Sequence, residues 1–227
     1  MNVYIDMYKA LFYKEWIKLR WPLLILSGLS FCIFLKMLLD TNTAIEVKGA
    51  YEIWYYVIFK NFLVYGDTKL IFPISGLIIS LAQFFPETRQ KRLKLLFHLP
   101  LDHNHSLFFM LLTGFCAVTF LVLFNFILLV LLMSAFFPAE IVKSAIVTSS
   151  PWYAAGFVAY IGASLAIVEP AAWRKIIYAI AAYFMVSMFY SNIHDAYAHS
   201  IHKFIILSMF YIFSLLLPAF RFKRGLR

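Results

Sequence analysis

Long apolar stretches separated by short polar segments repeat along this chain of 227 residues. A helix that crosses a bilayer needs about 20 mainly apolar residues, with a range of roughly 17–25. The stretches that meet this requirement are residues 21–39, 70–86, 106–133, 151–169, 176–193 and 204–220. The pattern therefore predicts an all-α membrane protein whose residues 1–227 form one transmembrane domain with six transmembrane helices.

The first segment, residues 1–20, carries an amphipathic pattern over residues 3–19. Its apolar positions fall at helical spacing, at Tyr4, Met7, Tyr8, Leu11, Phe12 and Trp16, with Lys9, Lys14 and Lys18 largely outside that stripe. This pattern is typical of a helix that lies in the membrane interface, with its apolar face in the acyl boundary and its lysines near anionic headgroups. Trp21-Pro22 is expected to break the helix and turn the chain into the bilayer. The alternative is a positively charged flank with a few chance aromatics.

Aromatic residues are also concentrated in residues 51–65. They recur at helical spacing, at Tyr51, Trp54, Tyr55, Ile58, Phe59 and Phe62. One interpretation is an aromatic belt or a short helix at the outer leaflet. The other is an outward extension of the second span, because the gap at Gly66-Asp67 is short.

The fourth span is expected to begin at Ser149-Ser150-Pro151, a cap followed by proline at the first helical position. Ala155, Ala159 and Ala163 then recur every four residues. Small residues at this spacing allow helices to approach closely in lipid. The contact is either internal or between two copies of the chain.

Composition agrees with a bilayer protein. Hydrophobic residues make up 63% of the chain and charged residues 14%, against roughly 45–50% and about 25% in soluble domains. The net charge of +9 does not indicate nucleic acid binding, because the cations lie at the ends of apolar runs. Cys32 and Cys116 lie within apolar runs and are expected to be buried and unpaired. The first apolar run starts only at Trp21 and is too long for a typical signal peptide, so we expect an uncleaved first span.

The distribution of Lys and Arg predicts the orientation. Alternate loops hold fourteen of the twenty cations on one side, in residues 9–20, 89–94, 174–175 and 221–227. Cytoplasmic loops carry the excess of positive charge. Both termini, including the basic tail at 221–227, are therefore expected on the cytoplasmic side of the cell (inner) membrane.

Ionisable residues are missing from the centres of the predicted spans. Asp67, Glu87 and Glu169 lie at span ends, Lys36 is near enough to the outer end to snorkel, and all six histidines lie outside span centres. Ion-coupled transporters need ionisable groups at membrane depth, and membrane cytochromes need axial histidines. The chain is therefore not expected to be an enzyme, and any uphill transport would need energy from elsewhere.

Residues 87–105 form a basic segment between the second and third spans. Within residues 88–99, Leu93, Leu96 and Phe97 make one apolar face, and Arg89, Lys91, Arg92, Lys94 and His98 cover the remainder. Leu99-Pro100 ends this short helix, because the residue before proline is pushed out of the helical region. The segment is interpreted as a cytoplasmic lever between two spans, or as an ordinary loop that fixes topology.

Here the chain resembles the permease subunits of type-2 ABC exporters. The resemblance rests on the elbow-like LFYKEWIKLRW at 11–21, and on Glu87 followed by RLKLLFHLPL at 92–101. In this family the second element is a coupling helix that docks on a cytoplasmic ATPase. The residues that the resemblance assigns to this dock are Glu87, Arg89, Lys91, Arg92, Leu93, Lys94, Leu96, Phe97 and Pro100. Those it assigns to the elbow are Tyr8, Phe12, Trp16 and Trp21. Lys91-Arg92 replaces a glycine common in the family, so the details of the dock differ.

The resemblance also implies partners. The chain lacks a G-x-x-x-x-G-K-[ST] phosphate loop, so ATP and Mg²⁺ belong on a separate ATPase subunit and this chain binds no cofactor. Two permease copies, expected to be a homodimer, would form the pathway for an amphiphile such as a lipid, lipopeptide, peptide or drug. The alternatives are a haem-exporter-like permease and a non-transport membrane scaffold or accessory subunit.

A second polar cluster occurs at residues 191–203. Asp195, His199 and His202 would share one helical face and are candidate ligands for zinc or copper. Short loops with histidine are common, and no cysteine supports a site here. We therefore favour a polar turn that meets water and headgroups, without a bound metal.

Overall fold

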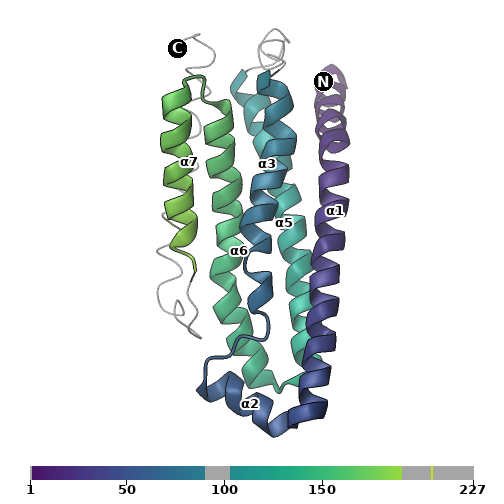
Figure 1. The fold of residues 1–227 in the computed structure, drawn as a ribbon. Helices are drawn as coiled ribbons and strands as arrows, with labels where there is room; N and C mark the ends of the chain where they lie inside the picture. Colours follow the sequence, from purple (N-terminus) through teal and green to yellow (C-terminus); the bar gives the residue numbers. More distant parts are fainter. Residues whose placement is uncertain (1, 90–102, 191–205, 207–227) are drawn as a thin grey trace.

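The computed structural model describes residues 2–89, 103–190 and 206, and shows long helices standing side by side (Figure 1). The elements are α1 (Asn2–Lys48), α2 (Ala50–Phe59), the 3-10 helix η1 (Gly66–Thr68), α3 (Ile71–Arg89), α5 (His103–Phe136), α6 (Ala139–Val168) and α7 (Ala172–Ser187). The long helices alternate in direction. The N-terminus, the end of α3, the start of α5 and the α6–α7 connection consequently meet at one end of the bundle, which we call the Glu87 end.

Within the described ranges, four helices are long and apolar enough to cross a membrane: α1, α3, α5 and α6. These helices contain the predicted spans at 21–39, 70–86, 106–133 and 151–169, so the structure agrees with them in helical form, length and hydropathy. Helix α7 has 16 residues, or about 24 Å at 1.5 Å per residue, and covers most of the predicted span at 176–193. The predicted span at 204–220 lies outside the described residues apart from Ile206.

The predicted break at Trp21-Pro22 is wrong, because α1 continues through Pro22 without interruption. Its buried residues Leu19, Leu23 and Leu26 form one stripe on both sides of the proline. A proline inside a helix removes one backbone hydrogen bond, and membrane helices tolerate this where neighbouring helices enclose them. Burial of the leucine stripe against the bundle offsets the missing bond.

The expected elbow is therefore the upright first part of α1 and not a separate helix. Phe12, Trp16 and Trp21 are between 48% and 62% exposed, and Phe12 and Trp16 line a hollow between α1 and α5. Tyr8 contacts α5, with its ring centroid 5.5 Å from that of Phe109. The outer face of this region is apolar and suits contact with lipid.

Helix α2 lies across the end of the bundle opposite to Glu87 (Figure 1). The chain turns into it at Gly49, whose φ of 85° favours glycine. Ile53 and Val57 are buried against the bundle, and Trp54 donates a hydrogen bond to the carbonyl of Phe136 at 3.3 Å. Residues 50–59 thus form a separate short helix, and the interpretation as an extension of the second span is wrong.

Helix α6 begins at Ala139, directly after Pro138, so the predicted start at Ser149-Ser150-Pro151 is also wrong. Pro151 lies inside the helix and cannot donate to the carbonyl of Val147, four residues earlier. The Ser150 hydroxyl donates to this carbonyl at 2.8 Å. A side chain therefore replaces the backbone donor that proline lacks, and the helix continues.

Ser150→Ala should destabilise the protein by about 1 kcal/mol, the usual contribution of one hydrogen bond, because Val147 loses its donor. The matched control is Ser187→Ala. Ser187 donates to the carbonyl of Phe184 in the same way, but the backbone amide of Met188 also donates to that carbonyl. Detergent-to-SDS titrations followed by circular dichroism should show a loss for the first variant only. Equal losses in both would contradict this role of Ser150.

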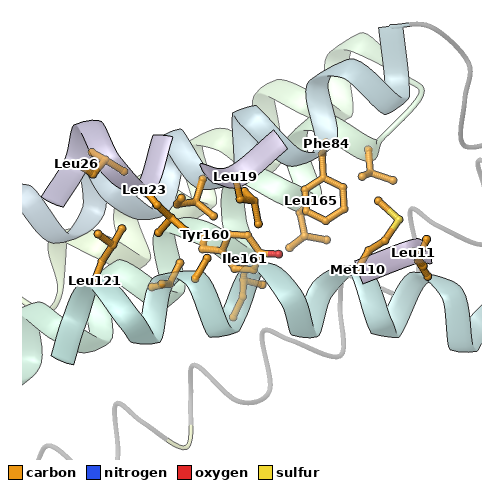
Figure 2. Close-up of a cluster of buried hydrophobic side chains, with 14 residues drawn as sticks. Leu11, Leu19, Leu23, Leu26, Phe84, Met110, Leu121, Tyr160, Ile161 and Leu165 are labelled. Atoms are coloured by element: carbon orange, nitrogen blue, oxygen red, sulfur yellow. The ribbon is translucent and has the colours of Figure 1, made fainter. Parts of the chain in front are cut away.

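The core divides into two main clusters of buried side chains along the bundle. The cluster nearer the Glu87 end contains Leu19, Phe84, Leu121, Tyr160 and Leu165 from four helices (Figure 2). The other cluster is closed by α2 and includes Trp152.

The backbones of α3 and α6 approach each other closely at two glycines. A Cβ atom at Gly76 would overlap the carbonyl oxygen of Gly156, and one at Gly156 would lie 3.1 Å from the carbonyl oxygen of Phe72. Ala155 and Ala159 are buried. Ala155 and Ala159 of the predicted stripe therefore lie inside the bundle, as the internal-contact alternative predicts, whereas Ala163 is only partly buried.

Candidate coupling site at the Glu87 end

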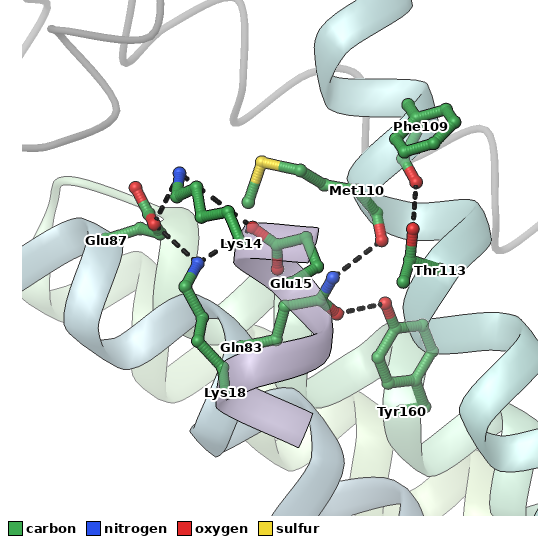
Figure 3. A network of polar contacts seen from close by, with 9 residues as sticks. All are labelled: Lys14, Glu15, Lys18, Gln83, Glu87, Phe109, Met110, Thr113 and Tyr160. Atoms are coloured by element: carbon green, nitrogen blue, oxygen red, sulfur yellow. Dashed lines mark hydrogen bonds and ion pairs between the residues drawn. The ribbon is translucent and has the colours of Figure 1, made fainter. Parts of the chain in front are cut away.

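Four charged side chains meet between α1 and α3 (Figure 3). Oε1 of Glu87 lies 2.8 Å from Nζ of Lys14 and 2.5 Å from Nζ of Lys18. Oε1 of Glu15 lies 2.8 Å from Nζ of Lys18 and 3.8 Å from Nζ of Lys14. Two carboxylates and two ammonium groups make the cluster electrically neutral, and we call these four residues the charge cluster.

Burial makes the charge cluster a strong constraint on the fold. Glu15 and Glu87 are fully buried, while 13% of the Lys18 side chain and 34% of the Lys14 side chain are exposed. An unpaired buried carboxylate costs several kcal/mol, so such a group requires an opposite charge at close range. Lys14 and Lys18 lie one helical turn apart and therefore share the face of α1 that meets Glu87. α1 is consequently held to the end of α3 in one register.

A second set of polar contacts lies beside the charge cluster and joins α3 to both α5 and α6 (Figure 3). The side-chain amide of Gln83 on α3 donates to the carbonyl of Met110 on α5 at 2.6 Å. The Tyr160 hydroxyl on α6 donates to Oε1 of Gln83 at 2.8 Å. Gly114 leaves room for both groups, because a Cβ atom there would overlap the Tyr160 hydroxyl and the Gln83 oxygen.

These contacts come from one polar face of α3. Gly76, Ser80, Gln83 and Glu87 follow at spacings of four, three and four residues, which places them on one side of a helix. Ser80 lies 3.1 Å from the hydroxyl of Ser164 on α6. The sequence interpretation missed this face, although the spacing is visible in the sequence. It also missed Glu15, whose isolation among apolar and basic residues was a signal that it needs a partner.

The structure separates two residues that the sequence grouped together as docking residues. Glu87 is buried and pairs with lysines of α1, whereas Arg89 is exposed, with its guanidinium 5.9 Å from the ring centroid of Phe85. The other residues of that set lie outside the described ranges: Lys91, Arg92, Leu93, Lys94, Leu96, Phe97 and Pro100. Their docking role stays a prediction.

Several other charged residues also differ from expectation. Lys14 and Lys18 do not extend toward headgroups, because Glu15 and Glu87 provide closer partners. Lys36 pairs with Asp67 at 3.0 Å. Glu169, at the end of α6, is fully buried and pairs with Nε of Arg174 at 2.9 Å, which fixes the connection to α7.

The two cysteines are exposed, and the residues that the sequence offers as metal ligands lie outside the described ranges. Cys32 and Cys116 are unpaired, as expected, but they are exposed on the helix surfaces and not buried. Asp195, His199 and His202 lie outside the described residues. Among the side chains that the structure describes, no group of three His, Cys, Asp or Glu could hold a metal ion.

The fold defines the class of protein as an α-helical chain with several candidate membrane spans. No protein-family model matches this chain, and neither a curated protein nor a solved structure matches it. The function must therefore be argued from the charge cluster and its place in the bundle.

Proposed function

We propose that this chain is the membrane permease subunit of a type-2 ABC exporter, which works as a dimer with separate ATPase subunits. The observation that carries the proposal is the pairing of Glu87 with Lys14 and Lys18. Glu87 is the acidic residue at the start of the coupling-helix motif. It lies at the end of α3, directly before residues 90–102, and its ion pairs connect this end to α1.

A force applied at residues 90–102 would be transmitted to the described helices through the chain itself and through side-chain contacts. The segment follows directly after α3 and precedes α5. Through Glu87 it is connected to α1, and through Gln83 to α5 and α6. A push by a partner would therefore move several spans together, as rigid-body rocking in transport requires.

The charge distribution supports a cytoplasmic location for this end. The described cations at or near it are Lys9, Lys14, Lys18, Arg20, Arg89, Arg174 and Lys175. Cytoplasmic loops are enriched in Lys and Arg. In this orientation the N-terminus lies on the cytoplasmic side of the cell (inner) membrane. An ATPase in the cytoplasm could then reach residues 90–102. The substrate of the proposal is an amphiphile, such as a lipid, lipopeptide, peptide or drug.

The test is affinity isolation of the full chain from native membranes in mild detergent, followed by mass spectrometry of the associated proteins. We expect a stoichiometric ATPase with a phosphate loop. Arg92→Glu/Lys94→Glu should abolish the association, because both cations lie in the predicted docking segment. The matched control, Lys60→Glu/Lys143→Glu, reverses two exposed cations outside that segment and should retain the ATPase. Absence of an ATPase from all samples would contradict the proposal and favour a scaffold.

A further inference from the structure

An apolar groove runs between α3, α6 and α7, with a volume of about 400 Å³. Its floor is made of small residues of α6, namely Ala159, Gly162, Ala163 and Ala166. Its walls are formed by Ile74, Leu77 and Leu81 of α3 and by Ala179, Ala182, Tyr183 and Val186 of α7. The short side chains of the floor leave space between the larger residues of the walls, and this apolar space suits an acyl chain.

Toward the Glu87 end, the groove continues into a second hollow of about 520 Å³. The two share Ala166, Ile167 and Ala179, so they form one continuous depression. Arg89 and Lys175 line the second hollow, and both are exposed. Among the described residues, no carboxylate forms an ion pair with either cation.

We propose that this depression binds an anionic phospholipid, with its phosphate between Arg89 and Lys175 and an acyl chain along the floor of α6. Lysine and arginine at the cytoplasmic end of membrane helices attract anionic headgroups, and basic pockets between such helices bind them. The apolar part contributes little selectivity, because lipid tails are as apolar as the groove. The two cations therefore determine which lipid is preferred.

The charges favour a lipid over a helix as the occupant. The predicted span at 204–220 could cover an apolar groove, but the chain has no Asp or Glu after Asp195. That segment would leave both cations without an anion. A second copy would present another Glu87 end, where cations outnumber carboxylates, and would add like charge.

The expected preference can be estimated. Each Lys or Arg near an anionic surface contributes about 1 kcal/mol, and 1.4 kcal/mol corresponds to a tenfold change in affinity. Two cations should therefore give phosphatidylglycerol an advantage of about 25-fold over phosphatidylcholine with the same acyl chains. This inference rests on the cytoplasmic orientation of the proposed function, but its measurement needs no ATPase partner.

The experiment is native mass spectrometry of the full chain with equimolar phosphatidylglycerol and phosphatidylcholine of matched chains. The wild type should retain phosphatidylglycerol, and Arg89→Gln/Lys175→Gln should lose the preference. The control Lys60→Gln/Lys143→Gln removes two exposed cations that do not line the depression, and it should behave as the wild type.

A further variant tests the groove itself. Ala163→Leu places a larger side chain on the floor and should reduce retention of both lipids, with no change in oligomeric mass. The proposal is overturned if the wild type retains no lipid, or if the control loses the preference as fully as the Arg89 and Lys175 variant. It is equally overturned if Ala163→Leu only dissociates a dimer, because a second copy would then be the occupant.

Discussion

Glu87→Gln is expected to lower the free energy of unfolding by roughly 3 kcal/mol, the lower end of the cost of removing one partner from a buried ion pair. The substitution keeps the shape of the side chain but leaves Lys14 and Lys18 with Glu15 as their only carboxylate within the charge cluster. The lower end of the range applies because 34% of the Lys14 side chain is exposed and retains contact with water. Thermal unfolding in detergent, followed by circular dichroism, would measure the loss.

Two comparisons make this prediction specific. Glu46→Gln is the same chemical change at an exposed residue of α1, and it should have almost no effect. Lys14→Gln combined with Glu87→Gln restores neutrality, because the Lys18–Glu15 pair at 2.8 Å remains, and should recover part of the loss. If Glu87→Gln proved as mild as Glu46→Gln, the charge cluster would not hold α1 to α3.

Gly76→Leu is expected to separate α3 from α6 and to cost about 3 kcal/mol, the upper end for overpacking in a core. A side chain at this position would overlap the carbonyl oxygen of Gly156 and approach the amide nitrogen of Tyr160 at 2.9 Å. Both are backbone atoms, which cannot rotate away as a side chain could. The fraction of protein that remains monodisperse on size exclusion after heating would report the change.

Gly28→Leu is the matched control for this substitution. Gly28 also lies inside a predicted span, but in the described part of the chain no other helix or side chain comes within 4 Å of a Cβ atom placed there. Leucine has a higher helix propensity than glycine by up to about 1 kcal/mol, so this variant should be as stable as the wild type or slightly more stable. Equal heat resistance of the two variants would show that the α3–α6 contact tolerates a wider spacing.

Much of the helical layout could be predicted from sequence because it depends on local properties. A stretch of about 20 apolar residues must bond its backbone internally in lipid, and a helix is the simplest way to do so. The spans at 21–39, 70–86, 106–133 and 151–169 follow from this requirement alone.

The sequence predicted one residue of the charge cluster, Glu87, but not its partners. Glu87 was identified through its motif, but its partners Lys14 and Lys18 lie about 70 residues earlier. Their helix was expected to lie flat, with the lysines in the headgroup region. An amphipathic pattern does not specify which neighbour covers a face, so the pairing could not be predicted.

The sequence by itself determined that this is an all-helical membrane-type chain with apolar spans and basic segments between them, because hydropathy acts over consecutive residues. Only the tertiary structure decided that the helices continue through Pro22 and Pro151. It also decided that Glu15 and Glu87 are buried between two lysines. Both outcomes depend on contacts with residues elsewhere in the chain, which compensate for a missing backbone bond or a buried charge.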